Sequence, residues 1–147
     1  MEINSLRGII FLNNKVGLKI ATINLSDHVT AFTLNRVLDQ ISVTAMGDTA
    51  NKFVTGLASD SITVSFLNDT AAGNVLATLQ AAFGTTVAFQ AIQDSSAAVS
   101  ATNLLYSGTI LVDNLTDING AVGDEGMIDI TFTCNSKTSY ASTGTWS

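Results

Sequence analysis

The chain has 147 residues, a net charge of −6 and a charged fraction of 12%, about half the usual share of roughly 25%. Its Lys and Arg residues number six and are scattered, which argues against a basic patch that grips nucleic acid. This length suits one domain that buries a core without disulfides or metals.

So few charges beside 46% hydrophobic residues leave a large neutral surface. Burial against other chains explains that surface more simply than a monomer covered with Thr, Ser and Asn does. The composition therefore favours self-association.

The first part of the chain contains weak strand patterns. An N-terminal arm at 1–14 precedes patterns at 15–25 and 28–34, which a turn at Ser26 and Asp27 joins. A clearer pattern follows at 41–46, where apolar and polar residues alternate.

The second part contains the clearest strands and one helix. At 61–67 and 127–133, Ile, Val and Phe alternate with Ser, Thr and Asp, which predicts half-buried strands. Further strands are predicted at 87–91 and at 104–112, where Gly108 marks a bulge or a close packing point.

A helix is predicted from Ala71 to Phe83, because apolar residues recur there at helical spacing. Asn68, Asp69 and Thr70 offer capping side chains before it, and Gly84 is a suitable stop.

These elements predict an α+β domain, mainly antiparallel β: a two-sheet sandwich or barrel with one flanking helix. The β domain spans 15–134, between the arm at 1–14 and a C-terminal arm at 135–147. Tyr140 and Trp146 lie in that C-terminal arm, and they pack either against a partner or back on their own domain. A loop at 47–57 also lies outside the core and carries Phe53 and Val54.

The residue types needed for enzymatic chemistry are scarce. His28 is the only histidine and Cys134 the only cysteine, so a zinc site with four N or S ligands is excluded. Neither a Gly-x-Ser-x-Gly elbow nor a Gly-Lys-Ser/Thr phosphate loop occurs. We therefore expect no enzyme, no catalytic residue, no cofactor and no metal ligand.

The acidic stretch from Asp113 to Asp124 is the one segment that invites a test for calcium. An EF-hand register that fits Asp117 and Asn119 places Leu115 at position 1 and Gly126 at position 12, and both fail. A solvated loop is favoured over an irregular calcium site. No secretory signal or membrane-spanning segment is visible, so assembly in a cytoplasm is expected.

The order of motifs between residues 40 and 133 resembles the major tail (tail tube) proteins of long, non-contractile tailed bacteriophages. A strand ending in Gly47-Asp48 is followed by Gly56-Leu57, the alternating strand 61–66 and the helix. Then come the strand 105–109, the turn Val122-Gly123-Asp124 and the strand 128–133.

That resemblance implies stacked rings, usually hexameric, whose inner strands join into one barrel around a channel for DNA. It implies that the loop 47–57 and both termini contact neighbouring copies. The candidate interface residues are Asp48, Lys52, Phe53, Val54, Leu57, Tyr140 and Trp146.

The expected partners are further copies of the chain, a tape-measure protein and a tail-terminator protein. Double-stranded DNA passes through without specific binding, because the chain is acidic. The expected location is the virion tail, assembled in the bacterial host cytoplasm. Two other classes remain open: a capsid decoration or host-attachment module, and a ring protein of a related contractile or secretion apparatus.

Overall fold

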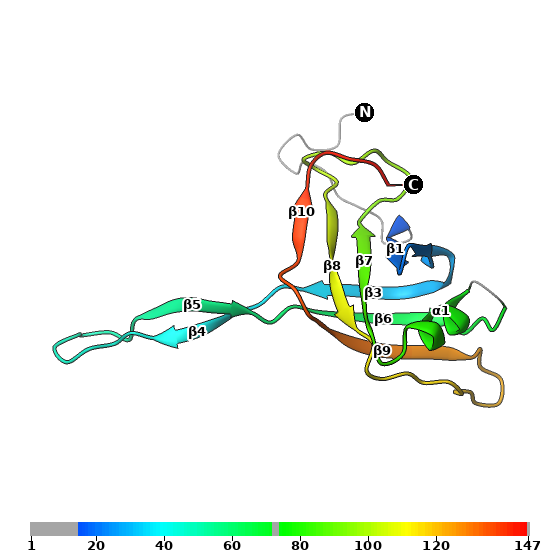
Figure 1. Cartoon of the computed structure of the whole chain (residues 1–147), viewed down its shortest axis with the longest axis horizontal. Helices are drawn as coiled ribbons and strands as arrows, with labels where there is room; N and C mark the ends of the chain where they lie inside the picture. The colour runs from blue at the N-terminus through cyan, green and yellow to red at the C-terminus, as the bar shows by residue number, and fades with distance from the viewer. Residues whose placement is uncertain (1–14, 72–73, 147) are drawn as a thin grey trace.

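The computed structural model describes residues 15–71 and 74–146, and the predicted N-terminal arm at 1–14 lies outside them. The elements follow one another along the chain in Figure 1. They are β1 (Gly17–Ile20), β2 (Ile23–Asn24), η2 (Ser26–His28), β3 (Val29–Asn35), β4 (Leu38–Ser42), β5 (Phe53–Ala58), β6 (Ser61–Leu67), α1 (Val75–Ala82), β7 (Thr86–Ile92), β8 (Leu105–Leu111), β9 (Met127–Cys134) and β10 (Ser139–Ala141).

Most of these strands belong to one antiparallel sheet of eight strands, in the order β2-β1-β7-β8-β9-β6-β3, with β10 added to β8. One edge of β8 is shared, since Ile110 and Leu111 pair with β9 while residues 105–107 pair with β10. The sheet therefore folds into two layers, and β1, β7, β8 and β10 run across β3, β6 and β9 (Figure 1).

The predicted antiparallel sandwich with a flanking helix is confirmed, but the sheet does not close into a barrel. β2 and β3 stand at the two ends of the strand order and do not pair with each other within the described residues. The other two described strands, β4 and β5, form a separate two-stranded sheet.

The core lies between the two layers and is made by the strands with the clearest alternation. In β6, Ile62, Val64 and Phe66 are fully buried. Their cross-strand partners on β9 are Phe132, Ile130 and Ile128. Burying each of these side chains contributes roughly 1.5–3 kcal/mol. The alternation predicted for both strands is confirmed.

The helix is shorter than predicted. It begins at Val75 rather than Ala71, and Gly84, at φ +83°, lies in the left-handed region just beyond its end. Phe83 was expected on the apolar face but is 54% exposed, because its backbone is already extended and leaves the helical direction. The prediction that Asn68, Asp69 or Thr70 caps the helix is wrong, since the N-cap is Asn74 and makes no capping side-chain hydrogen bond. The Asp69 carboxylate accepts the Ala71 N–H before the helix, and its backbone carbonyl accepts the Leu76 N–H.

The strand pattern at 15–25 is interrupted. β1 ends at Ile20, and Ala21 and Thr22 take positive φ values of 52° and 68° in a two-residue turn that leads to β2. The predicted turn at Ser26 and Asp27 is a short 3-10 helix that leads directly into β3.

Gly108 on β8 is a close packing point and not a bulge. The register of β7 and β8 is unbroken, and Gly108 stands opposite Phe89. A Cβ at this position would come within 3.0 Å of Phe89 Cε1. The absence of a side chain therefore lets the Phe89 ring lie across β8.

We expect Gly108→Ala to destabilise the domain by about 1–3 kcal/mol, because the Phe89 ring cannot keep its place beside an added methyl group. Denaturant unfolding measures the change in the free energy of unfolding. Gly120→Ala is the control, since nothing lies within 4 Å of a Cβ there. Equal stability of the two variants would contradict the close packing.

Candidate assembly surfaces

The most prominent surface is a hairpin that reaches away from the two-layered body (Figure 1). We call residues 38–58, which comprise β4, β5 and the turn between them, the hairpin arm. The sequence predicted a strand at 41–46 and a loop at 47–57. The structure corrects this: β4 ends at Ser42 and Phe53–Ala58 is strand β5, because Ser42 pairs with Phe53 and Ile41 with Val54.

Within residues 15–71 and 74–146, neither face of the hairpin arm packs on a core. Ile41 and Val54 lie opposite each other and are each about half exposed, as is Phe53. Leu57 is 82% exposed and Met46, in the turn, is fully exposed. A two-stranded hairpin is marginally stable in water by itself, and its apolar side chains gain stability only when something covers them. The arm is therefore the surface best suited to bind another chain.

The end of the arm is organised by its own polar side chains. The carboxylate of Asp48 accepts hydrogen bonds from the Ala45 N–H at 2.8 Å and from Lys52 Nζ at 2.9 Å. The Ala45 N–H, and after it Lys52, lower the pKa of Asp48. Gly47 takes the positive φ of 92° that the turn requires. Asp48 and Lys52, both candidate interface residues, thus shape the turn that presents Met46.

The root of the arm contains a buried carboxylate that sequence reasoning missed. Asp60 is 3% exposed, and its two oxygens accept hydrogen bonds from the Val37 N–H at 3.0 Å and the Thr138 N–H at 2.8 Å. Burial by itself raises the pKa of Asp60, but these two N–H groups, the Thr138 hydroxyl and the charge of Arg36 together lower it. An Asp between two strand patterns has the composition of an ordinary turn, so no local signal identified it.

The C-terminal segment returns to its own domain. Ser139–Ala141 forms β10 on β8, where Tyr140 stands opposite Tyr106 with ring centroids 6.0 Å apart. Tyr140 remains 56% exposed, and the Arg36 guanidinium lies 5.2 Å above its ring. Its place in an interface stays a prediction.

Trp146 packs back on its own domain, which is one of the two arrangements considered for it. Lys19 Nζ lies 4.6 Å from the centre of its ring, which also rests on Gly17. These contacts within the chain do not test an interface role, which stays a prediction.

Among the described strands, the outer edge of β3 has no partner. Within the described residues β3 pairs only with β6, so its other edge carries unpaired backbone groups. A cleft of about 860 Å³ runs beside β3, and Phe32, Leu34, Ile92 and Tyr106 are among its lining residues. An extended strand of another chain can pair at such an edge.

The acidic loop between β8 and β9 is largely exposed, with Ile118 at 93% and Val122 at 107%. In the described part of the chain, no three His, Cys, Asp or Glu side chains lie together as a metal site needs. His28 and Cys134 have separate surroundings: His28 Nε2 lies 2.9 Å from Asp69 Oδ2, while burial raises the pKa of the Cys134 thiol beside Thr138. Among residues 15–71 and 74–146 no helix is long and apolar enough to cross a membrane.

The packing of Trp146 generates a fluorescence prediction. A Cβ at Gly17 would lie 2.6 Å from Trp146 Cζ2, so Gly17→Ala must displace the ring. Because the chain has a single Trp, its emission reports this displacement directly. We expect a red shift and easier quenching by acrylamide, with Gly120→Ala unchanged. A Gly17→Ala spectrum identical to that of the parent would contradict the fold-back position.

Comparison with known proteins supports the architecture. No protein-family model matches the sequence, and neither does any curated protein. A chain of the virion of a native gene transfer agent particle superposes with a TM-score of 0.67 at 12% identity, covering 90% of this chain and 99% of the other. A chain of the tail of an empty gene transfer agent particle, which has C6 symmetry, gives 0.59 at 16% identity, covering 78% and 82%. The protein therefore has the fold of a component of these virion and tail particles.

Proposed function

We propose that this protein is a non-enzymatic structural subunit that assembles with copies of itself into stacked, hexameric rings forming the tube of a tail. The single observation that carries the proposal is the hairpin arm, which holds apolar side chains such as Phe53 and Leu57 away from any core of its own chain. Such an arm has a use only when a second chain covers it.

Two further observations support rings over other assemblies. One fold neighbour belongs to a tail with C6 symmetry. The open edge of β3 invites strand pairing, and closed rings consume such edges without leaving one free to aggregate. Ring closure through sheet edges and stacking through the arm are thus separate contacts made by separate surfaces.

The proposed tube is a conduit for double-stranded DNA within the virion tail. A net charge of −6 per subunit repels the phosphate backbone and favours sliding over binding. A tape-measure protein and a tail-terminator protein are the proposed partners that set its length and end, and assembly takes place in the host cytoplasm before release.

A ring protein of a contractile or secretion apparatus is the second candidate, because the same arm and open edge would serve it equally. A capsid decoration or host-attachment module is less favoured, since it gives the arm no role in stacking. The assembled form distinguishes the three candidates. A long bare tube supports the tail-tube subunit, and isolated rings support the ring protein of a contractile or secretion apparatus. A lasting monomer supports the decoration or attachment module.

Electron microscopy of the concentrated protein tests the proposal. We expect hollow tubes of stacked rings from the parent, and at most separate rings but no tubes from Phe53→Asp, because a charge at this half-exposed apolar position of the arm opposes burial against the stacked neighbour. Phe53→Leu, which keeps an apolar side chain, is the matched control and should assemble. The melting temperature should change little in Phe53→Asp, since the position lies outside the core. Assembly of Phe53→Asp at the parent's level would remove the arm from the interface.

A DNA-retention assay tests the role of the charge. Parent protein at low salt should leave the mobility of linear duplex DNA unchanged, because low salt strengthens the repulsion between like charges. Retention that weakens as salt is added would mean that the chain binds DNA through its cations, and the conduit proposal would then fail.

A further inference from the structure

The hairpin arm is joined to the body by two short connections that meet at Asp60. Val37 precedes β4, and Asp60 lies between β5 and β6, so both strands of the arm enter the body at this point. β4 and β5 pair with each other and with no other described strand. No sheet hydrogen bond therefore fixes the direction of the arm relative to the body.

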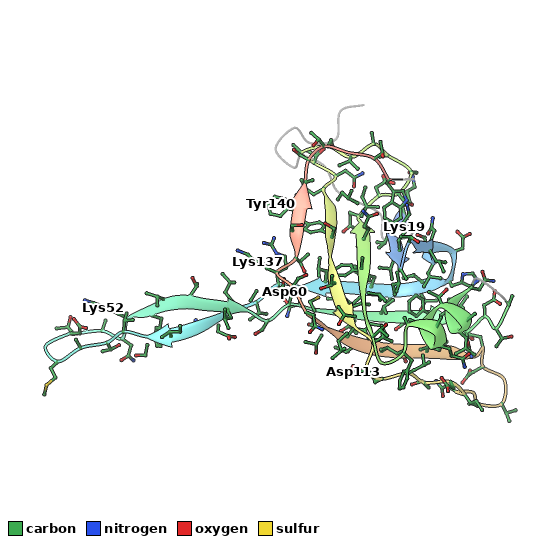
Figure 2. All side chains as sticks on the ribbon, in the orientation of Figure 1. Lys19, Lys52, Asp60, Asp113, Lys137 and Tyr140 are labelled. Atoms are coloured by element: carbon green, nitrogen blue, oxygen red, sulfur yellow. The ribbon has the colours of Figure 1, made fainter. Side chains whose placement is uncertain are left out.

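Hydrogen bonds to Asp60 connect the arm to the body. Its carboxylate accepts hydrogen bonds from the Val37 N–H at 3.0 Å and the Thr138 N–H at 2.8 Å. Its backbone carbonyl accepts the Cys134 N–H at 2.9 Å, and the Ser59 N–H donates to the Val37 carbonyl at 2.7 Å. Asp60 thus joins Val37, just before the first strand of the arm, to the end of β9 and to the turn before β10, and Figure 2 places it at the root of the arm.

We propose that Asp60 is a positioning residue whose buried carboxylate fixes the direction of the hairpin arm, and so prepares the arm to bind a neighbouring copy. The fixed direction is a property of the single chain. Its consequence for assembly rests on the proposed function. A pre-aimed arm binds without first losing the freedom to pivot, which is a cost that lowers the affinity of flexible segments.

Burial raises the pKa of Asp60, but its hydrogen bonds and, to a lesser degree, the charge of Arg36 lower that pKa and keep the carboxylate ionised. Arg36, between β3 and β4, lowers its pKa by its charge. Asp39 on β4 accepts the Ser59 hydroxyl at 3.0 Å, and Lys137 lies on the turn that leads to β10 (Figure 2). Cys134 is neutral at pH 7, since burial raises its pKa. The hydrogen bonds that the Asp60 carboxylate accepts from the Val37 and Thr138 N–H groups are therefore present at neutral pH.

The direction of the pKa shift sets the pH at which the arm is released. The pKa of Asp60 in the folded chain lies below its ordinary value of 3.8, so the ionised form is the one that folding favours. The stabilisation of the fold by the ionised Asp60 carboxylate is complete above that ordinary pKa. It is lost as the pH falls through the pKa of Asp60 in the folded chain. Protonation places an O–H donor where a backbone N–H already donates, and one bond is lost.

A distance measurement between two spin labels tests the proposal on the full chain. The labels are placed by Met46→Cys at the end of the arm and Asp129→Cys on the exposed face of β9, in a Cys134→Ala background. Asp60→Asn keeps one acceptor oxygen and turns the other into a donor that opposes an N–H. Asp39→Asn is the matched control, because it removes the same charge from the same root.

In Asp60→Asn we expect the ratio of held to free arm to fall about tenfold, which is the effect of losing one hydrogen bond to a charged acceptor. The distance distribution should broaden at pH 7, and Asp39→Asn should keep the narrow parental distribution. An Asp60→Asn distribution as narrow as the parent's would overturn the proposal. So would equal broadening in Asp39→Asn, because lost charge alone would then explain the effect.

If Asp60→Asn fails to fold, acid titration of the parent tests whether the Asp60 carboxylate fixes the direction of the arm. The distribution should broaden reversibly as the pH falls through the folded pKa of Asp60, which lies below 3.8, while far-ultraviolet circular dichroism still shows the folded sheet. A distribution that stays narrow until the sheet itself unfolds would overturn the proposal. Electron microscopy of the unlabelled proteins separates the two ideas: if the parent never forms rings, the proposed function fails while the spin-label result stands.

Discussion

The constraint on which the structure depends is that one edge of β8 has two successive partners. β9 pairs with the last residues of β8 and then turns away, and β10 pairs with the first residues. The turn between them is held by the Asn135 N–H on the Thr109 carbonyl at 3.0 Å and by Ser136 Oγ, which accepts the Thr109 N–H at 3.1 Å. Because a single sheet is bent at this turn, its two halves face each other and enclose the core.

The same turn is where the hairpin arm is attached, so the fold of the body and the direction of the arm share one set of contacts. Thr138, just before β10, is buried and donates its N–H to Asp60. A buried carboxylate is stable only when its oxygens are paired, and here backbone donors from two distant segments pair them. Loss of either donor would leave an unpaired carboxylate oxygen in a buried site, at a cost in stability.

The parts that sequence analysis predicted are those in which one face of a strand is buried and the other is wet. Ile62, Val64 and Phe66 alternate with polar residues because β6 lies between core and solvent. In the arm both faces are exposed, and although apolar and polar residues alternate at 41–44, the sequence of β5 follows no two-residue period, so β5 was predicted to be a loop. Ala21 and Thr22 carry no turn signal, because residues with positive φ are normally Gly or Asn. Asp60 is defined by partners 23 and 78 positions away, which no local pattern contains.

The exposed surfaces also differ from those of a protein that must remain a monomer. Monomeric β proteins protect open edges with Lys, Pro or bulges, and they limit exposed apolar patches. This chain has no proline at all and few charges. Strand β3, whose outer edge is unpaired among the described residues, contains no charged side chain, although its register on β6 shifts between Val29 and Ala31. Between its root at Asp39 and its end at Asp48 and Lys52, the apolar side chains of the arm are interrupted by Gln, Ser and Thr, which can be buried at less cost than charged groups. Both surfaces would promote aggregation if assembly did not cover them, and a closed ring with stacked neighbours covers both.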